Sequence, residues 1–282
     1  MRPLFHSIEH MTPSTDYTID ELISVCICRQ IVNGEVVAQG IATPLVMAGI
    51  LLAKLTHAPD IWIASAVGGT LCRDWSPLGL AGIEKPWLDH GLVLMPFPRI
   101  TCEFLPRFNV REFFRPAQAD ACGNFNNVFI GSDYARPQMR LPGSGGIPDV
   151  TLFDQHAMLY VPRHSRAVFV EQLDFLSGLG HAPNRTAGRG PQYCITNLGQ
   201  FDYAQGRMRL TSYHPGQSIE KIQAKTGFKL EAAPDVRETE PPTAEEVRLL
   251  REAIDPLGVR KLETLSGALR KELIREILRR EA

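Results

Sequence analysis

Short apolar strand candidates alternate with helical segments along this chain, and that alternation restricts the fold more than any other feature. Residues 35–40 (EVVAQG) and the largely apolar run 61–66 (IWIASA) are predicted strands, and residues 45–55 (LVMAGILLAKL) between them are a predicted buried helix. Strand, helix and strand at this spacing are typical of a βαβ unit, whose strands lie parallel in one sheet. The pattern therefore predicts an α/β fold: an open, mostly parallel sheet with helices on both faces.

The same rhythm continues through the second half of the chain. Four further short apolar runs are predicted strands: residues 127–130 (NVFI), 156–161 (HAMLYV), 167–170 (AVFV) and 194–196. The segment 181–192 is rich in Gly, Pro and Arg and is predicted to be an exposed loop. Upstream, the apolar spacing from residue 20 to 31 predicts an amphipathic helix, whereas the acidic, proline-rich segment 231–242 is predicted to be an extended linker.

The C-terminal end predicts two helices in succession. A Thr-Ala-Glu-Glu capping box opens the first helix at residue 243, and Pro256 ends it. Apolar residues at spacings of three and four predict the second helix: Leu262, Leu265, Leu269, Leu273 and Ile277. This second helix either packs on its own domain or forms a partner-binding tail. We divide the chain into an N-terminal arm (1–18), an α/β domain (19–242) and C-terminal helices (243–282), which form a helical tail on the α/β fold.

Charge and composition restrict the partners. The chain has 30 Lys and Arg against 31 Asp and Glu, so it lacks the basic excess of nucleic-acid binders. Its longest apolar stretch, 41–55, is interrupted and is shorter than the roughly 20 residues that span a bilayer. The N-terminus has no apolar core of a signal peptide, and the six cysteines show no zinc-ligand spacing. We therefore expect a cytoplasmic protein without bound metal, acting on small molecules or proteins and not on nucleic acid or membranes.

A glycine-rich turn at residues 141–146 (LPGSGG) is one candidate for chemistry. Glycines allow positive φ and close approach to a ligand, and successive N–H groups in such a turn can bind an anion or an oxyanion. The turn matches neither a P-loop nor a dinucleotide-binding fingerprint, and an ordinary tight turn is the alternative. The candidate residues are Gly143, Ser144, Gly145 and Gly146.

A second glycine-rich turn, residues 65–69 (SAVGG), directly follows a predicted strand. Ligands of open α/β sheets collect at the carboxyl ends of strands, so Ser65 and Gly68 are positional candidates for an active site. The turn has no Gly-x-Ser-x-Gly elbow, and a simple strand-to-helix turn would explain it too.

Amides and arginines lie between these features. Asn124 and Asn126 could hydrogen-bond a carbonyl group or brace their own loop. Arg136 and Arg140 lie between a predicted strand and the turn at 141–146, where two guanidinium groups would suit a carboxylate or a phosphate. Solvated surface arginines are the alternative.

Taken together and in order, several segments resemble the β (B) subunit of the family I CoA-transferases, which include glutaconate CoA-transferase. The resemblance spans about residues 20–256 and leaves out the second C-terminal helix. The segments that carry it are 57–61 (HAPDI), 123–126 (GNFN), 141–146 (LPGSGG), 169–171 (FVE), 195–202 (ITNLGQFD), 208–216 (MRLTSYHPG) and 226–228 (TGF).

The resemblance implies an open α/β sheet, an obligate α subunit of the same fold in an α2β2 assembly, and acyl-CoA substrates bound where the subunits meet. Coenzyme A would arrive as part of the substrate, with no separate cofactor. The residues to which the resemblance and the local patterns assign substrate or CoA binding are Asn124, Asn126, Arg136, Arg140, Gly143, Ser144, Gly145 and Gly146.

One departure from the family pattern affects the expected reaction. In the transferases a β-subunit glutamate, in a Glu-x-Gly turn after the strand that follows Pro-Asp, attacks the thioester. Here that turn reads Ser65-Ala66-Val67-Gly68, and Ala66 occupies the glutamate position. A methyl group cannot attack a thioester, and Ser65 has no readable base beside it.

We therefore expect the β subunit of an acyl-CoA enzyme of CoA-transferase fold that acts as a C–C hydrolase or as a lyase. Similar subunits without the glutamate include those of a steroid ring-opening CoA hydrolase and of a decarboxylase. The predicted substrate is a carboxylated acyl-CoA, with Arg140 at its carboxylate, the amides of Gly145 and Gly146 at an oxygen of the thioester, and acid–base groups supplied by the α subunit. The alternatives are a CoA-transferase whose nucleophile lies elsewhere and a non-catalytic scaffold subunit.

Overall fold

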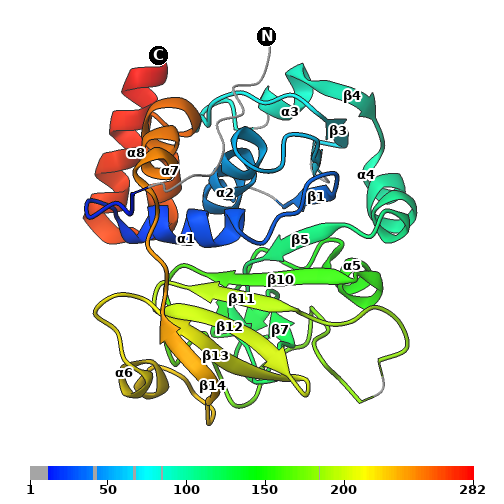
Figure 1. The fold of residues 1–282 in the computed structure, drawn as a ribbon. Helices are drawn as coiled ribbons and strands as arrows, with labels where there is room; N and C mark the ends of the chain where they lie inside the picture. The colour runs from blue at the N-terminus through cyan, green and yellow to red at the C-terminus, as the bar shows by residue number, and fades with distance from the viewer. Residues whose placement is uncertain (1–11, 41–42, 66–67, 84, 184) are drawn as a thin grey trace.

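A ten-stranded sheet organises the computed structural model, which describes residues 12–40, 43–65, 68–83, 85–183 and 185–282 (Figure 1). Its strand order is β14-β13-β12-β11-β10-β5-β1-β2-β3-β4, and the five strands from β11 to β2 run parallel. The strands of this sheet are β1 (Val36–Gln39), β2 (Trp62–Ser65), β3 (Thr70–Cys72), β4 (Gly91–Leu94), β5 (Arg111–Phe114), β10 (His156–Val161), β11 (Tyr193–Thr196), β12 (Gly199–Ala204), β13 (Arg207–Tyr213) and β14 (Glu231–Glu238). The predicted open, mostly parallel sheet is confirmed.

Two short hairpins lie outside the main sheet. One pairs β6 (Gln118–Ala119) with β7 (Phe125–Asn126), and the other pairs β8 (Phe129–Ile130) with β9 (Met139–Arg140). Helical segments complete the fold: α1 (Ile19–Cys28), α2 (Pro44–Leu55), α3 (Lys85–Asp89), α4 (Phe97–Arg99), η1 (Ile100–Phe104), η2 (Leu105–Arg107), α5 (Ile147–Phe153), α6 (Ile219–Ala224), α7 (Ala244–Leu249), η3 (Leu250–Ile254), η4 (Val259–Glu263) and α8 (Gly267–Glu281). Among the described residues, no helix is both long and apolar enough to cross a membrane.

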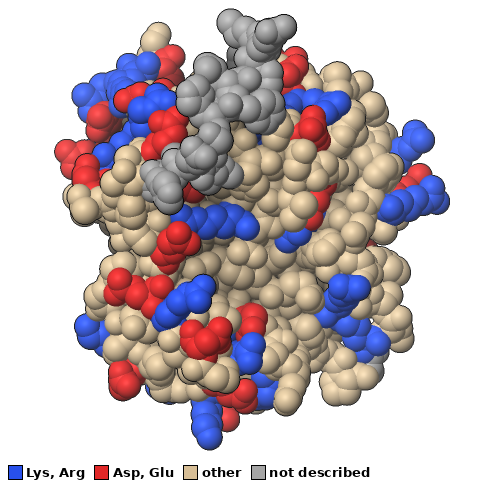
Figure 2. Space-filling model, viewed as in Figure 1, with Lys and Arg blue, Asp and Glu red and all other residues tan. Residues whose placement is uncertain are grey.

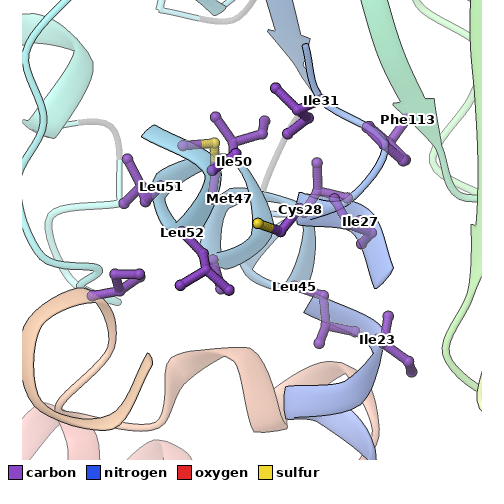
Figure 3. Packing of buried hydrophobic residues seen from close by; sticks show 14 of the residues in the cluster. Ile23, Ile27, Cys28, Ile31, Leu45, Met47, Ile50, Leu51, Leu52 and Phe113 are labelled. Atoms are coloured by element: carbon purple, nitrogen blue, oxygen red, sulfur yellow. The ribbon is translucent and has the colours of Figure 1, made fainter. Parts of the chain in front are cut away.

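The sheet buries a separate apolar core on each face, because successive strand residues point to opposite sides. Val37 and Ile63 face α1 and α2, in a cluster that also contains Ile23, Ile27 and several α2 residues (Figure 3). Their neighbour Ala38 faces the other core, which holds residues of η1, η2, α5 and α6. Helices therefore cover both faces, as the sequence predicts.

The C-terminal helices pack on the first of these cores. Leu250 and Ile277 are both fully buried there, whereas Leu269 is 63% exposed. The predicted capping box at the start of α7 forms in full, since the N–H of Glu246 bonds the Thr243 hydroxyl and the Glu246 carboxylate accepts the N–H of Thr243. The second helix starts at Gly267, later than predicted, because η4 forms a 3-10 turn around Leu262.

Three local predictions were wrong. The expected linker at 231–242 contains β14, an edge strand that pairs with β13 across an irregular stretch; an edge tolerates Pro234, which lacks an N–H donor. The run 167–170 forms a turn, and only Phe169 makes an isolated bridge to the strand residue Ala119. In the run 127–130 only the last two residues form a strand, and it lies in a hairpin outside the main sheet.

Candidate functional site

A pocket of about 460 Å³ lies at the carboxyl ends of β5 and β10. In the sheet, β1 has β2 on one side and β5 on the other. The order in which the chain adds strands to the sheet therefore reverses beside this pocket, and ligands of open α/β sheets bind at such a reversal. The residues that line it are Thr43, Arg115, Pro116, Ala117, Asn127, Pro142, Gly143, Tyr160, Val161, Pro162, Arg163 and Val168.

The lining carries two cations and no carboxylate. Arg115 directly follows β5, and Arg163 lies two residues after β10. Arg163 is exposed and makes no ion pair with any described residue, whereas Arg115 is ion-paired at one nitrogen only. The Thr43 hydroxyl is buried and has no hydrogen-bond partner in the described part of the chain. The pocket therefore presents positive charge, and the Thr43 hydroxyl is buried in its wall.

Glu263 of η4 lies behind this lining. Its Oε2 accepts hydrogen bonds from Arg115 Nη1 at 2.8 Å and from the Tyr160 hydroxyl at 3.0 Å, and its Oε1 accepts the N–H of Leu45 at 3.0 Å. Burial raises the pKa of Glu263, and the Arg115 guanidinium opposes that rise. Burial and the neighbouring Glu263 raise the pKa of Tyr160 well above its ordinary value, so its hydroxyl remains a donor.

The glycine turn at 141–146 reaches the pocket through Gly143. Its N–H is already used, because it donates to the carbonyl of Asn127 at 2.9 Å. Gly143 and Gly145 both have positive φ, +108° and +51°, and a Cβ on either would meet no atom within 4 Å. Ser144 and Gly146 lie in the same turn outside the lining. The turn is open at its tip, and binding of an oxygen by its amides stays a prediction.

Asn127 connects that turn to the loop after β5. Its Nδ2 donates to the carbonyl of Arg115 at 3.1 Å, and its Oδ1 accepts the N–H of Ala117 at 2.8 Å. The sequence motif at 124–127 includes this amide, but only Asn124 and Asn126 were predicted to bind substrate.

Asn124 and Asn126 lie outside the pocket lining and brace their own loop. The fully buried Asn126 donates to Gln118 Oε1 at 2.8 Å. Asn124 donates to Asp120 at 2.8 Å and accepts the N–H of Gly180 at 2.7 Å. These contacts match the alternative that the two amides brace their own loop. A direct contact of either amide with substrate stays a prediction.

Arg136 and Arg140 are both exposed, on and near the β8–β9 hairpin, and neither lines the pocket. The Arg140 guanidinium lies 4.5 Å from the centre of the Tyr134 ring and donates to the Tyr134 carbonyl at 2.7 Å. The structure therefore holds Arg140 on an aromatic side chain, and its assignment to a substrate carboxylate stays a prediction.

Ser65 ends β2, at the same edge of the sheet as the pocket. Ser65 is buried, and its hydroxyl accepts the N–H of Gly68 at 3.0 Å. Among the described residues, no histidine or carboxylate bonds this hydroxyl, so nothing activates it as a nucleophile. Ala66 lies outside the described residues.

Sequence reasoning missed the residues that the tertiary structure places in or behind the pocket: Thr43, Arg115, Tyr160, Arg163 and Glu263. One usable signal was the position of Arg115 and Arg163 just after the ends of parallel strands. Glu263 had no such signal, because it lies 148 residues from its partner Arg115. In the described part of the chain, no group of three or more His, Cys, Asp or Glu is placed to hold a metal ion.

Comparison with known proteins gives consistent matches. The family model described as "Coenzyme A transferase" matches residues 21–225. The B subunit of glutaconate CoA-transferase from Acidaminococcus fermentans is 32% identical over 264 residues, which cover 87% of this chain and 96% of the relative. The cholesterol ring-cleaving hydrolase IpdB subunit of Mycobacterium tuberculosis is 32% identical over 232 residues, which cover 79% and 89%. The solved decarboxylase AibA/AibB superposes with a TM-score of 0.76 at 30% identity, covering 87% of this chain and 98% of the matched one.

Proposed function

The chain belongs to the coenzyme A transferase family, and from this premise we propose that it is the B-type subunit of a heteromeric acyl-CoA enzyme that breaks a carbon–carbon bond, as a hydrolase or a lyase. The observation that carries the proposal is the missing nucleophile. Ala66 occupies the position that the family resemblance gives to the attacking glutamate, and the pocket lining contains no carboxylate.

The neighbouring groups do not replace that nucleophile. The Ser65 hydroxyl is occupied as an acceptor and has no base beside it among the described residues. Glu263, whose carboxylate bonds the lining residues Arg115 and Tyr160, is already bonded by three donors and is 5% exposed. An attack on a thioester by either side chain would require breaking these contacts first.

The pocket suits bond cleavage that builds up negative charge. When a carbon–carbon bond of an acyl-CoA breaks, its electron pair moves onto the thioester carbonyl, and a proton later restores the neutral carbon. In a decarboxylation the carboxylate leaves as CO2, whereas in a hydrolysis water adds to the carbonyl carbon that is released. Cations and hydroxyl donors fixed in advance stabilise such charge, typically by several kcal/mol per site.

The proton donors and acceptors would come from an A-type subunit. The pocket of this chain offers arginines and hydroxyl groups, whose ordinary pKa values lie far above neutrality, and its lining has no residue suited to general acid–base catalysis near pH 7. The relatives are named as B or IpdB subunits, and the solved decarboxylase contains two different chains, AibA and AibB. We infer an α2β2 assembly with the acyl-CoA bound beside the subunit contact and coenzyme A supplied as part of the substrate.

A classical CoA-transferase is the second candidate, favoured by the 32% identity to the glutaconate enzyme over nearly its whole length. The two reactions differ in a covalent intermediate. A transferase passes through a glutamyl-CoA thioester on the protein, which hydroxylamine cleaves and borohydride reduces.

The test is co-expression with an A-type subunit, followed by incubation with glutaryl-CoA or glutaconyl-CoA and both trapping reagents. Glutaconate CoA-transferase, treated in parallel, is the positive control for trapping. We expect a stable heteromer, no modified peptide from this chain, and release of CO2 from glutaconyl-CoA, whose double bond carries the electron pair to the thioester carbonyl; glutaryl-CoA, which lacks this double bond, should release none. A peptide from residues 60–75 that carries a hydroxamate or an alcohol in place of a side-chain carboxylate, or full activity of this chain as a monomer, would refute the proposal.

A further inference from the structure

The pocket cation Arg115 is held from behind by a residue of the C-terminal segment. Glu263 lies in η4, beyond the residues 21–225 that match the family model. Its carboxylate accepts Arg115 Nη1 at 2.8 Å and leaves the other guanidinium nitrogens of Arg115 without a partner among the described residues. The Arg115 side chain is 38% exposed, so these nitrogens are accessible to a ligand in the pocket.

Glu263 is well suited to fix the orientation of that side chain. It is 5% exposed and its two oxygens accept three hydrogen bonds, from Arg115, Tyr160 and Leu45, which hold the carboxylate in one position. A guanidinium group is planar, so fixing one nitrogen limits the directions in which the remaining donors point. The contact therefore orients Arg115 in advance of ligand binding.

The charge around the pocket favours an anionic ligand. Arg115 and Arg163 face it, no carboxylate lines it, and the buried Thr43 hydroxyl is an unused hydrogen-bond group. On the visible face of the molecule, by contrast, charges of both signs are interspersed without a broad basic patch (Figure 2).

We propose that Arg115 binds an anionic group of the acyl-CoA substrate in this pocket, and that Glu263 is the positioning residue that aims Arg115 at it. This inference rests on the proposed function. The shared chemistry of the ligand is a group with two or more anionic oxygens, and an acyl-CoA can supply it as a terminal carboxylate on the acyl chain or as a phosphate of coenzyme A.

The test measures equilibrium binding of four probes to the protein in the assembly in which it is isolated from cells, in phosphate-free buffer: glutaryl-CoA, butyryl-CoA, 3′-dephospho-glutaryl-CoA and free coenzyme A. Arg115→Gln should weaken glutaryl-CoA binding about ten- to 100-fold, because charged hydrogen bonds to the ligand are lost. Arg166→Gln is the matched control, since Arg166 is exposed on the same loop as Arg163 and lies outside the pocket lining.

The probes distinguish the two sources of the anion. If Arg115 binds the acyl carboxylate, Arg115→Gln weakens glutaryl-CoA and leaves butyryl-CoA and free coenzyme A within about twofold. If it binds the 3′-phosphate, the loss is equal for glutaryl-CoA, butyryl-CoA and coenzyme A and disappears with the dephospho probe. An equal loss for all four probes identifies the pyrophosphate, the anion common to them all, as the group bound by Arg115.

The role of Glu263 needs a readout that a purely structural residue would not change. Glu263→Gln should lower affinity for the same probes as Arg115→Gln, by about three- to tenfold, and should add almost nothing in the double variant. A merely structural role would lower the melting temperature and weaken every probe alike, with additive losses. If Glu263→Gln does not fold, Glu263→Asp replaces it: the shorter side chain keeps the charge but withdraws the carboxylate from Arg115 Nη1, and it should weaken the same probes as Arg115→Gln.

Two results overturn the inference in different ways. Unchanged binding of all four probes by Arg115→Gln refutes the role of Arg115 and leaves the proposed function intact. Failure of the wild-type protein to bind any CoA thioester refutes the proposed function, and the inference with it.

Discussion

Arg260 is the most deeply buried cation of the described chain, and its replacement should be among the most destabilising single changes in this protein. Its side chain is 1% exposed and forms ion pairs with Asp20 Oδ2 at 2.8 Å, with Glu21 Oε1 at 2.8 Å and with Asp255 Oδ2 at 2.9 Å. The Nε–Oδ2 pair to Asp20 is close but is not aligned as a hydrogen bond. These contacts connect the C-terminal segment to α1.

The magnitude follows from what Arg260→Met leaves behind. Glu21 keeps a second partner, because Arg251 bonds it at 2.7 and 3.0 Å, but Asp20 and Asp255 lose their ion-pair partner inside the protein. Removing one partner of a buried ion pair typically costs about 3–5 kcal/mol. With a urea m-value of about 3 kcal/mol per molar, the unfolding midpoint should fall by about 1–2 M at an unchanged m-value.

The assay is urea unfolding followed by circular dichroism, at pH 7 and at pH 5. The matched control is Arg248→Met, whose side chain is 51% exposed and pairs with Glu245 and Glu252; it should cost no more than about 1 kcal/mol. Burial raises the pKa of Asp255 and the Arg260 charge partly offsets that rise, so Asp255 takes up a proton more readily in Arg260→Met. The destabilisation should therefore shrink at pH 5. A loss below about 1 kcal/mol at pH 7, or the same loss at both pH values, would refute the reasoning.

Three further outcomes are expected. Burial raises the pKa of Glu112 to about 8 and that of Asp154 to about 7. Between about pH 4.5 and 8 the folded protein therefore keeps protons that the unfolded chain has released, and the free energy of unfolding of the wild type should fall as the pH rises through this range. Glu112→Gln should flatten that decline in melting temperature, and an unchanged slope would contradict the assignment. At Gly145, φ is +51° and an added Cβ would meet no atom within 4 Å. Gly145→Val should therefore lower the free energy of unfolding by about 1–2 kcal/mol or more through backbone strain alone. Gly145→Asn should cost much less in the same urea unfolding assay, because Asn adopts positive φ more readily. Ile277→Ser should lower the free energy of unfolding by about 2–5 kcal/mol because that side chain is fully buried. Leu278→Ser, at 44% exposure, should lower it by no more than about 1 kcal/mol. Equal losses in thermal unfolding would show that α8 is not packed as described.

Much of the fold could be predicted because its signals are local. The apolar runs of β1, β2, β10 and β11, the buried helix α2 and the capping box at Thr243 each depend on residues only a few positions apart. The edge strand β14 was missed for the opposite reason. It is polar and contains Pro234, and it forms a strand only because β13 offers a free edge to pair with.

The candidate site was harder to predict, since its parts come from distant segments. The glycine turn was visible in the sequence, but only Gly143 of that turn's glycines lines the pocket. Arg140 looked like an anion ligand from its neighbourhood, but its guanidinium lies over the ring of Tyr134, which belongs to the loop of the same β8–β9 hairpin. A side chain's direction depends on what packs around it, and spacing along the chain does not contain that information.

The sequence by itself determined the class of fold, the order of the family's motifs and the absence of a carboxylate at position 66, because periodicity and residue identity are properties of the chain. Only the tertiary structure decided which charges meet. Glu263 lies behind Arg115 and Tyr160, and Arg260 lies among three carboxylates, because packing of the C-terminal helices on α1 and α2 removes these groups from water together. A buried charge is stable only beside a partner, and that partner is chosen by proximity in space, at separations of more than 100 residues for several of these pairs.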